Sequence, residues 1–160
     1  KRQQAYVPEL LMDDRAMKGS LELLKSHLKG EKTDTIGKIV IGTVFGDLHD
    51  IGKNLVASMF EGCGFEVVNM GVNISADKFV ETVKIEKPDI LCLSALLTTT
   101  MSYMKVVMDA LEKEGLRDQV KVMVGGAPVN ELFANQIGAD GYSGNANAAV
   151  IKAKELLCIA

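Results

Sequence analysis

Long apolar runs are missing from the sequence, and none approaches the roughly twenty residues that a membrane-spanning helix needs. The first residues, Lys1 to Gln4, are not followed by the apolar core of a signal peptide. Excess charge of one sign is missing too, because the net charge is −3 and the 24% of charged residues are mixed in sign. These absences predict a soluble, cytoplasmic protein whose partners include neither a membrane nor a nucleic acid.

Cysteine and histidine are scarce, with three and two residues respectively. Cys63, Cys92 and Cys158 are odd in number and fall in stretches expected to be helical or extended, which predicts buried reduced thiols without a disulfide framework. None has a neighbouring Cys or His that would activate it as a nucleophile. His27 and His49 lie far apart, so a conventional zinc site would lack ligands. Any metal must therefore take most of its coordination from something other than the protein.

The 160 residues, 48% of them hydrophobic with a mean hydropathy of +0.14, are sufficient for one domain with a full core. Short apolar runs alternate with amphipathic segments from Lys38 onward. The predicted strands are 38–44, 65–70, 89–94, 120–124 and 139–142. The predicted helices are 52–62, 75–86, 101–114, 130–137 and 146–157. This alternation predicts an α/β fold, in which a parallel sheet is covered on both faces.

An amphipathic helix is predicted ahead of this domain, with Pro8 in its first turn and Gly30 at its end. Its apolar residues follow a heptad-like spacing at Leu10, Met17, Leu21, Leu24 and Leu28. One such helix cannot bury its apolar stripe alone. Its packing neighbours are therefore expected either outside this sequence or in the domain that follows. Residues 31–37 are interpreted as a linker and 38–160 as the main domain. The absence of an initiating Met leads us to expect further sequence upstream.

A histidine stands inside a glycine-bracketed turn, between the first predicted strand and the helix that follows it. Parallel sheets bind ligands at the carboxyl ends of their strands, which makes His49 a candidate site residue. Asp47 can accept a hydrogen bond from one imidazole nitrogen and leave the other for a metal. On these two residues alone, His49 can equally be a surface histidine and Asp47 a helix-capping residue.

Three other strand ends are also polar or rich in glycine. Ser94 and the threonines 98–100 follow the third strand, and these hydroxyls are too many for helix capping alone. Gly125 and Gly126 end the fourth strand, where they permit either a close ligand or a tight turn before Pro128. The residues at 143–145 follow the fifth strand. A long ligand between these loops is the site that the pattern favours.

The motif Asp47-x-His49-x-x-Gly52, followed by Ser94-x-Leu96 and by Gly125-Gly126, resembles the corrinoid proteins of methyltransferase systems. These proteins are relatives of the cobalamin-binding module of methionine synthase. The resemblance covers nearly the whole chain. It implies a flavodoxin-like (Rossmann-like), doubly wound five-stranded parallel sheet with the strand order 2-1-3-4-5. It also implies that residues 1–30 are the C-terminal helix of a truncated helical cap ahead of this sheet.

The resemblance also implies a site. The cofactor is cobalamin or a related corrinoid, and His49 is the lower axial ligand of its cobalt in the base-off, His-on mode. Asp47 and Thr100 complete a ligand relay, with Thr100 where the methionine synthase relatives carry Ser. The implied cofactor-binding residues are Gly46, Asp47, Leu48, His49, Asp50, Ile51, Gly52, Ser94, Leu96, Thr98, Thr100, Gly125, Gly126 and Tyr142.

The implied function is that of a methyl carrier without catalysis of its own. Its implied partners are a donor-specific methyltransferase, an acceptor methyltransferase using tetrahydrofolate or coenzyme M, and a reductive activation protein. Two alternatives remain within the resemblance: the cobalamin-binding subunit of an adenosylcobalamin-dependent mutase, and a corrinoid-dependent sensor module. A flavodoxin-like domain that binds no corrinoid is the alternative outside it.

Overall fold

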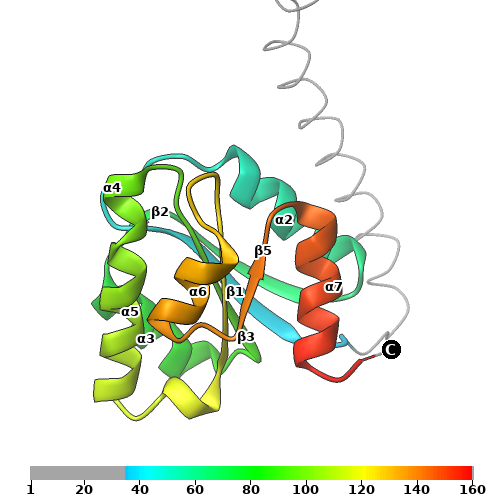
Figure 1. The fold of residues 1–160 in the computed structure, drawn as a ribbon. Coiled ribbons are helices and arrows are strands. Elements are labelled where there is room, and N and C mark those ends of the chain that lie inside the picture. Colours follow the sequence, from blue (N-terminus) through cyan, green and yellow to red (C-terminus); the bar gives the residue numbers. More distant parts are fainter. Residues whose placement is uncertain (1–34, 160) are drawn as a thin grey trace, which may run out of the picture. The chain divides into compact units, whose positions relative to one another are not determined.

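The computed structural model describes residues 35–159, which form a five-stranded sheet with helices on both faces (Figure 1). The strand order is β2-β1-β3-β4-β5, and all four neighbouring pairs are parallel. The predicted fold class and strand order are confirmed. The helix predicted within residues 1–30 and most of the predicted linker lie outside the described residues.

The elements follow one another in regular alternation. The strands are β1 (Lys38–Val44), β2 (Glu66–Ile74), β3 (Ile90–Ser94), β4 (Lys121–Gly125) and β5 (Gly141–Ser143). The helices are α2 (Ile51–Gly62), α3 (Ala76–Glu86), α4 (Thr98–Met101), α5 (Tyr103–Lys113), α6 (Glu131–Ile137) and α7 (Ala146–Leu156), with a short 3-10 turn at Arg117–Gln119. No helix in this described part is both long enough and apolar enough to cross a bilayer.

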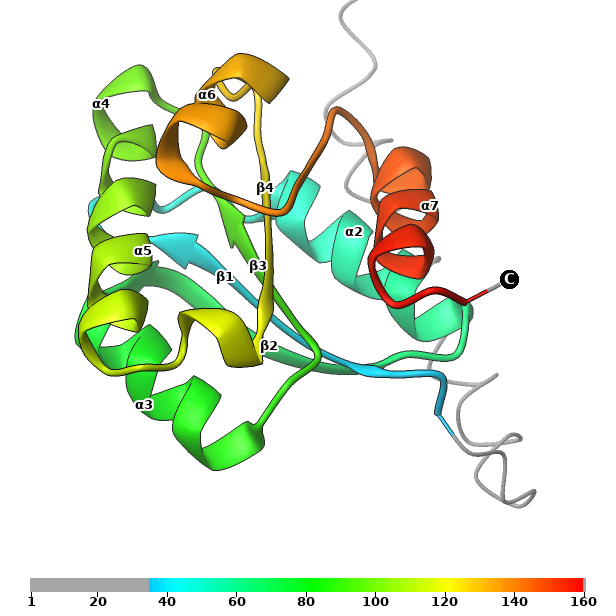
Figure 2. The ribbon, with the colours of Figure 1, turned by 60° about the horizontal axis from the view of Figure 1, so that its bottom comes forward.

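Two apolar cores lie on opposite faces of the sheet because successive strand side chains point to opposite sides. Val40, Leu91 and Val122 belong to the core beneath α3, α5 and α6. Ile39 and Ile90 belong to the core beneath α2 and α7. Figure 2 shows α2 and α7 together on one face, away from α3 and α5. The interiors of β1, β3 and β4 are almost entirely apolar because both faces of these central strands are covered. The exceptions are Thr43 inside β1 and the polar residues at the strand ends, Lys38, Ser94 and Lys121.

Three elements differ from their predicted bounds by more than one residue. β2 continues to Ile74 instead of ending at Met70, through two irregularities in its pairing with β1. The helix predicted at 101–114 is α5, which begins only at Tyr103, and a separate short helix, α4, precedes it. The last strand is only three residues long. At the start of the described part, Ile36 and Gly37 hydrogen-bond through their backbones to Gly64 and Glu66.

The prediction of three buried thiols is wrong for two of them. Cys92 is buried in β3, but Cys63 and Cys158 are exposed, and all three are free. Cys63 is the residue that caps the carboxyl end of α2, and Cys158 follows the last turn of α7. Both positions are at helix ends, where the apolar periodicity that suggested burial has already stopped.

Candidate functional site

The loop that carries His49 begins where β1 ends at the carboxyl edge of the sheet. The chain turns there because the amide of Asp47 donates to the carbonyl of Val44 at 3.1 Å, with Gly46 at a φ of 85°. Such a left-handed backbone favours glycine. The loop then passes directly into α2, which begins at Ile51.

The carboxylate of Asp47 is fully buried and accepts four hydrogen bonds. The donors are the Thr100 hydroxyl at 2.6 Å, the Leu96 amide at 2.8 Å, the His49 amide at 3.0 Å and the Nδ1 atom of His49 at 2.8 Å. Burial by itself would raise the pKa of Asp47, but the hydrogen bonds, led by that of Thr100, hold the pKa well below its usual range. Asp47 is therefore ionised and links the loops that follow β1 and β3.

The imidazole of His49 has its orientation set by this carboxylate. Since an ionised carboxylate only accepts hydrogen bonds, Nδ1 carries the proton and Nε2 carries the lone pair of the neutral ring. No hydrogen bond within the described residues reaches Nε2, and the side chain is 52% exposed. The hydroxyl of Thr43, in β1, donates a hydrogen bond to the backbone carbonyl of His49 at 2.9 Å and so holds the backbone of the loop. The Nε2 atom of His49 is therefore directed away from the Asp47 carboxylate, on a ring and a backbone that hydrogen bonds hold in place.

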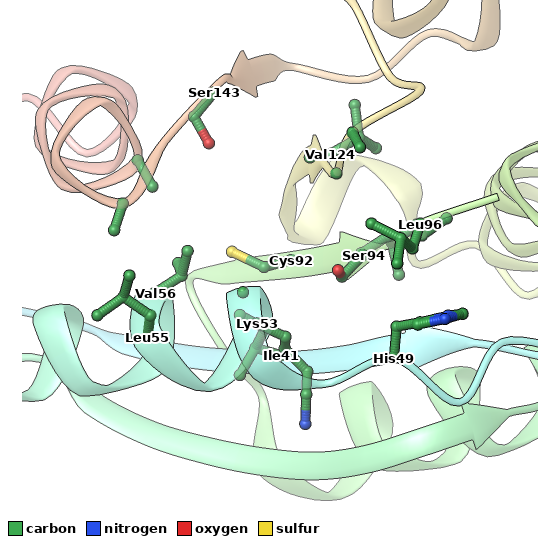
Figure 3. Close-up of a pocket in the computed structure, with 18 of the residues that line it drawn as sticks. Ile41, His49, Lys53, Leu55, Val56, Cys92, Ser94, Leu96, Val124 and Ser143 are labelled. Carbon is green, nitrogen blue, oxygen red and sulfur yellow. The ribbon is translucent and has the colours of Figure 1, made fainter. Parts of the chain in front are cut away.

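A cavity of about 680 Å³ extends from His49 into the domain. It lies between α2 and α7 over the ends of β3, β4 and β5. Figure 3 shows His49 and Leu96 at one end and Leu55 and Val56 at the other, with Cys92 and Ser94 between them. The volume is in the range of small-molecule and cofactor sites. The cavity is long enough for a ligand that descends from His49 between two helices.

Most of the residues implied by the resemblance lie on this cavity. They are Leu48, His49, Asp50, Ile51, Gly52, Ser94, Leu96, Gly125, Gly126 and Tyr142. Asp47 and Thr100 lie behind His49 instead, as the relay requires. Gly46 is in the turn of the loop, and the exposed Thr98 in α4 does not line the cavity. Among Ser94 and the threonines 98–100, only Thr100 is buried.

The glycines of the implied site have different structural causes. A Cβ on Gly126 would lie 1.8 Å from the carbonyl oxygen of Ala95, so the residue is required by the close approach of two loops. A Cβ on Gly52 would meet nothing within 4 Å, although this residue lines the cavity. Packing within the protein therefore explains Gly126, whereas Gly52 leaves space that is available to a ligand.

Several side chains of the site were not predicted from the sequence. Cys92 and Met123 line the deep part of the cavity from the interiors of β3 and β4. Lys53 lines it too, although its ammonium turns to Asn69 of β2 at 2.7 Å (Figure 3). A usable signal existed for Thr43, which is a fully buried polar residue in an otherwise apolar strand.

Cys92 gives a prediction that needs no cofactor. Burial raises the pKa of this thiol from 9.0 to about 12, which lowers its thiolate fraction at pH 8 by about a thousandfold. With an aromatic disulfide reagent, we expect Cys63 and Cys158 to react rapidly and Cys92 only slowly or after unfolding. The slow phase should disappear in Cys92→Ala. Three thiols reacting at one rate in the folded protein would contradict the burial of Cys92.

The donor set fits a cofactor that brings its own metal and most of its ligands. Among residues 35–159, no cluster of three or more His, Cys, Asp or Glu side chains is arranged to hold an ion. What the protein offers is one imidazole nitrogen, an exposed rim at Leu48 and Ile51, and a long cavity beside it. A macrocycle that needs one axial ligand and a pocket for an appended tail matches these features.

The family model of the B12 binding domain matches residues 37–151, and the chain belongs to this family. It is a corrinoid-binding protein with a Rossmann-like fold, and its cofactor is cobalamin or a related corrinoid.

Relatives of known description agree with this assignment. The chain is 44% identical over 158 residues to dimethylamine corrinoid protein 2 of Methanosarcina acetivorans, covering 98% of this chain and 73% of that protein. Among solved structures, the monomethylamine corrinoid protein of Methanosarcina barkeri is 38% identical with a TM-score of 0.72, covering 96% and 73% of the two chains. The methanol:cobalamin methyltransferase complex MtaBC of the same species contains a chain that is 33% identical with a TM-score of 0.78, covering 96% and 58%.

Proposed function

We propose that this protein is the methyl carrier of a methylamine methyltransferase system. A bound corrinoid supplies a cobalt centre that can accept and release a methyl group. The identity to dimethylamine and monomethylamine corrinoid proteins supports a methylated amine as the donor and favours the carrier over a mutase subunit or a sensor. The proposed partners are a donor-specific methyltransferase, an acceptor methyltransferase that uses tetrahydrofolate or coenzyme M, and a reductive activation protein.

His49 is the proposed lower axial ligand of the cobalt. The observation that carries this assignment is its imidazole, whose Nδ1 atom is bound to the buried Asp47 carboxylate while Nε2 is left to a ligand. A histidine that binds a metal is oriented and made more basic by such a carboxylate partner. The remaining cofactor-binding residues of the proposal are those around the cavity, which would receive the tail of the corrinoid.

The relay of Asp47 and Thr100 is proposed to control the ligation. If a bound cobalt released the imidazole, the Nε2 atom would be free to accept a proton, and a nearby negative charge would balance the imidazolium. The ionised Asp47 provides that charge, and the hydroxyl of Thr100 keeps this carboxylate in place. The chain itself positions the ligand, and activation of the methyl donor belongs to the partner enzyme.

The absorption spectrum of the protein loaded with hydroxocobalamin tests the ligand assignment. We expect His49→Ala to retain corrinoid but to change the bands that report the axial ligand, because water replaces the imidazole. His27→Ala, which removes the only other histidine of the sequence, is the matched control and should keep the wild-type bands. If His49→Ala also keeps them, His49 is not the ligand and the relay has no function.

A further inference from the structure

The extension of β2 beyond its predicted end brings an asparagine against the loop of His49. The side-chain oxygen of Asn73 accepts a hydrogen bond from the Gly46 amide at 2.8 Å. In the other direction, the backbone N–H of Asn73 donates a hydrogen bond to the backbone carbonyl of Asp47 at 3.0 Å. Both bonds are made to residues just ahead of His49, so this part of the loop is fixed to the strand at two points.

A second asparagine of the same strand holds the opposite end of the loop. Asn69 accepts from the Lys53 ammonium at 2.7 Å and donates to the Asn54 side chain at 3.0 Å. Lys53 and Asn54 belong to the first turn of α2, directly after the loop. β2 therefore holds both the start and the end of the segment that carries His49.

The conformation of Asn73 indicates that its side chain serves the loop more than the strand. Its φ is 56°, in the left-handed region that Gly, Asn and Asp adopt at the least cost. Together with Gly71 at a φ of 93°, it lies in the part of β2 where the pairing with β1 becomes irregular. A glycine would satisfy this backbone equally well, but only an asparagine or an aspartate would also provide the acceptor for Gly46.

We propose that Asn73 is a positioning residue for the axial ligand. By fixing Gly46 and Asp47, it sets the place of the His49 imidazole before the corrinoid binds, so that less reorganisation accompanies ligation of cobalt. Partners that orient a metal ligand contribute about 10- to 100-fold to metal affinity when they contact the ligand itself. Asn73 acts one step further away, so we expect a smaller effect. This inference rests on the proposed function, in which His49 binds the cobalt.

Cyanide displacement measures the strength of that bond at a constant pH. A first cyanide replaces the upper hydroxide of hydroxocobalamin, and a second then competes with the imidazole for the lower face of cobalt, so the midpoint of this second step is the quantity compared. In Asn73→Gly loaded with hydroxocobalamin, we expect the cyanide concentration at half-displacement to fall by about fivefold, the equivalent of one hydrogen bond. Asn73→Asp keeps an acceptor and a residue that tolerates the left-handed backbone, and it should stay within twofold of the wild type. Asn135→Ala, on an exposed position of α6, is the matched control.

A measurement on the cofactor-free protein supports the same test. Hydrogen exchange of the Gly46 amide should become at least several-fold faster in Asn73→Gly, but not in Asn73→Asp, since only the former lacks the acceptor. An unchanged cyanide midpoint in Asn73→Gly would overturn the inference, as would equal effects of the Gly and Asp variants. If the axial bands respond to His49→Ala but the Asn73 variants give either of these contradicting results, only the positioning role of Asn73 is wrong. If they do not respond, the ligand assignment and the positioning role are both wrong.

Discussion

Replacing Asp47 with Asn is expected to lower the free energy of unfolding at pH 7 by about 3 kcal/mol and to weaken the axial ligation. The carboxylate accepts four hydrogen bonds in a fully buried position, whereas the amide group of Asn would turn its own N–H groups toward some of these donors. A buried donor left without an acceptor costs about 1–3 kcal/mol. Denaturant unfolding of the two cofactor-free proteins measures the difference.

The stability that Asp47 contributes should also depend on pH, in a direction that its lowered pKa determines. Because the folded protein holds the pKa of Asp47 below its ordinary value of 3.8, folding favours the ionised form. The resulting stability is complete above about pH 5 and is lost as the pH falls through 3.8 toward the lower folded pKa. The difference between wild type and Asp47→Asn should therefore narrow as the pH falls below about 4.

The matched control for Asp47 is Asp50→Asn in the same loop. Asp50 is exposed and makes no side-chain capping bond to α2. The free energy of unfolding of the Asp50→Asn protein should therefore differ from that of the wild type by less than about 0.5 kcal/mol. Equal effects of the two substitutions, or a difference that does not depend on pH, would contradict the electrostatic account of Asp47.

Gly126→Ala is expected to destabilise the fold by more than about 3 kcal/mol and to prevent corrinoid binding. The added Cβ would lie 1.8 Å from the carbonyl oxygen of Ala95, and the φ of 128° is strained for any residue with a side chain. The loops after β3 and β4 would have to separate, which moves Leu96 and its hydrogen bond to Asp47. Thermal unfolding followed by circular dichroism measures the loss.

Gly52→Ala is the comparison that separates packing from ligand binding. Its Cβ would meet no atom within 4 Å, and alanine is the better residue inside a helix, so the cofactor-free protein should be as stable or slightly more stable. A stable Gly126→Ala protein would show that the two loops adapt easily, and the packing explanation for this glycine would be wrong.

The order of elements and the loop of His49 could be predicted from the sequence because both depend on local patterns. Apolar runs with alternating helices predict a parallel sheet, and ligand sites in such sheets lie at the carboxyl ends of the strands. The hydrogen bond between Thr100 and Asp47 could not be predicted from a local pattern. The two residues are 53 positions apart, and only the resemblance to a known family indicated that they meet, as the structure then showed.

The path of β2 and the depth of the cavity could not be predicted, since both depend on tertiary packing. Gly71 and Asn73 are residues typical of a turn, and their continuation as a strand depends on irregular pairing with β1. Strand alternation places Cys92 and Met123 on one face, but it does not indicate that α2 and α7 leave a space above them. That space depends on the relative placement of the two helices, which no local pattern encodes.

The irregular course of β2 also shapes the free edge of the sheet. As an outer strand of the sheet, β2 presents backbone groups that another chain could use as a template for strand addition. Glycine and a left-handed asparagine interrupt this template within its last four residues. An incoming strand would find a regular ladder only over the first part of β2, where the exposed charge of Glu66 stands. The residues that hold the histidine loop therefore also interrupt the free edge of the sheet, as natural edge strands commonly do against strand addition.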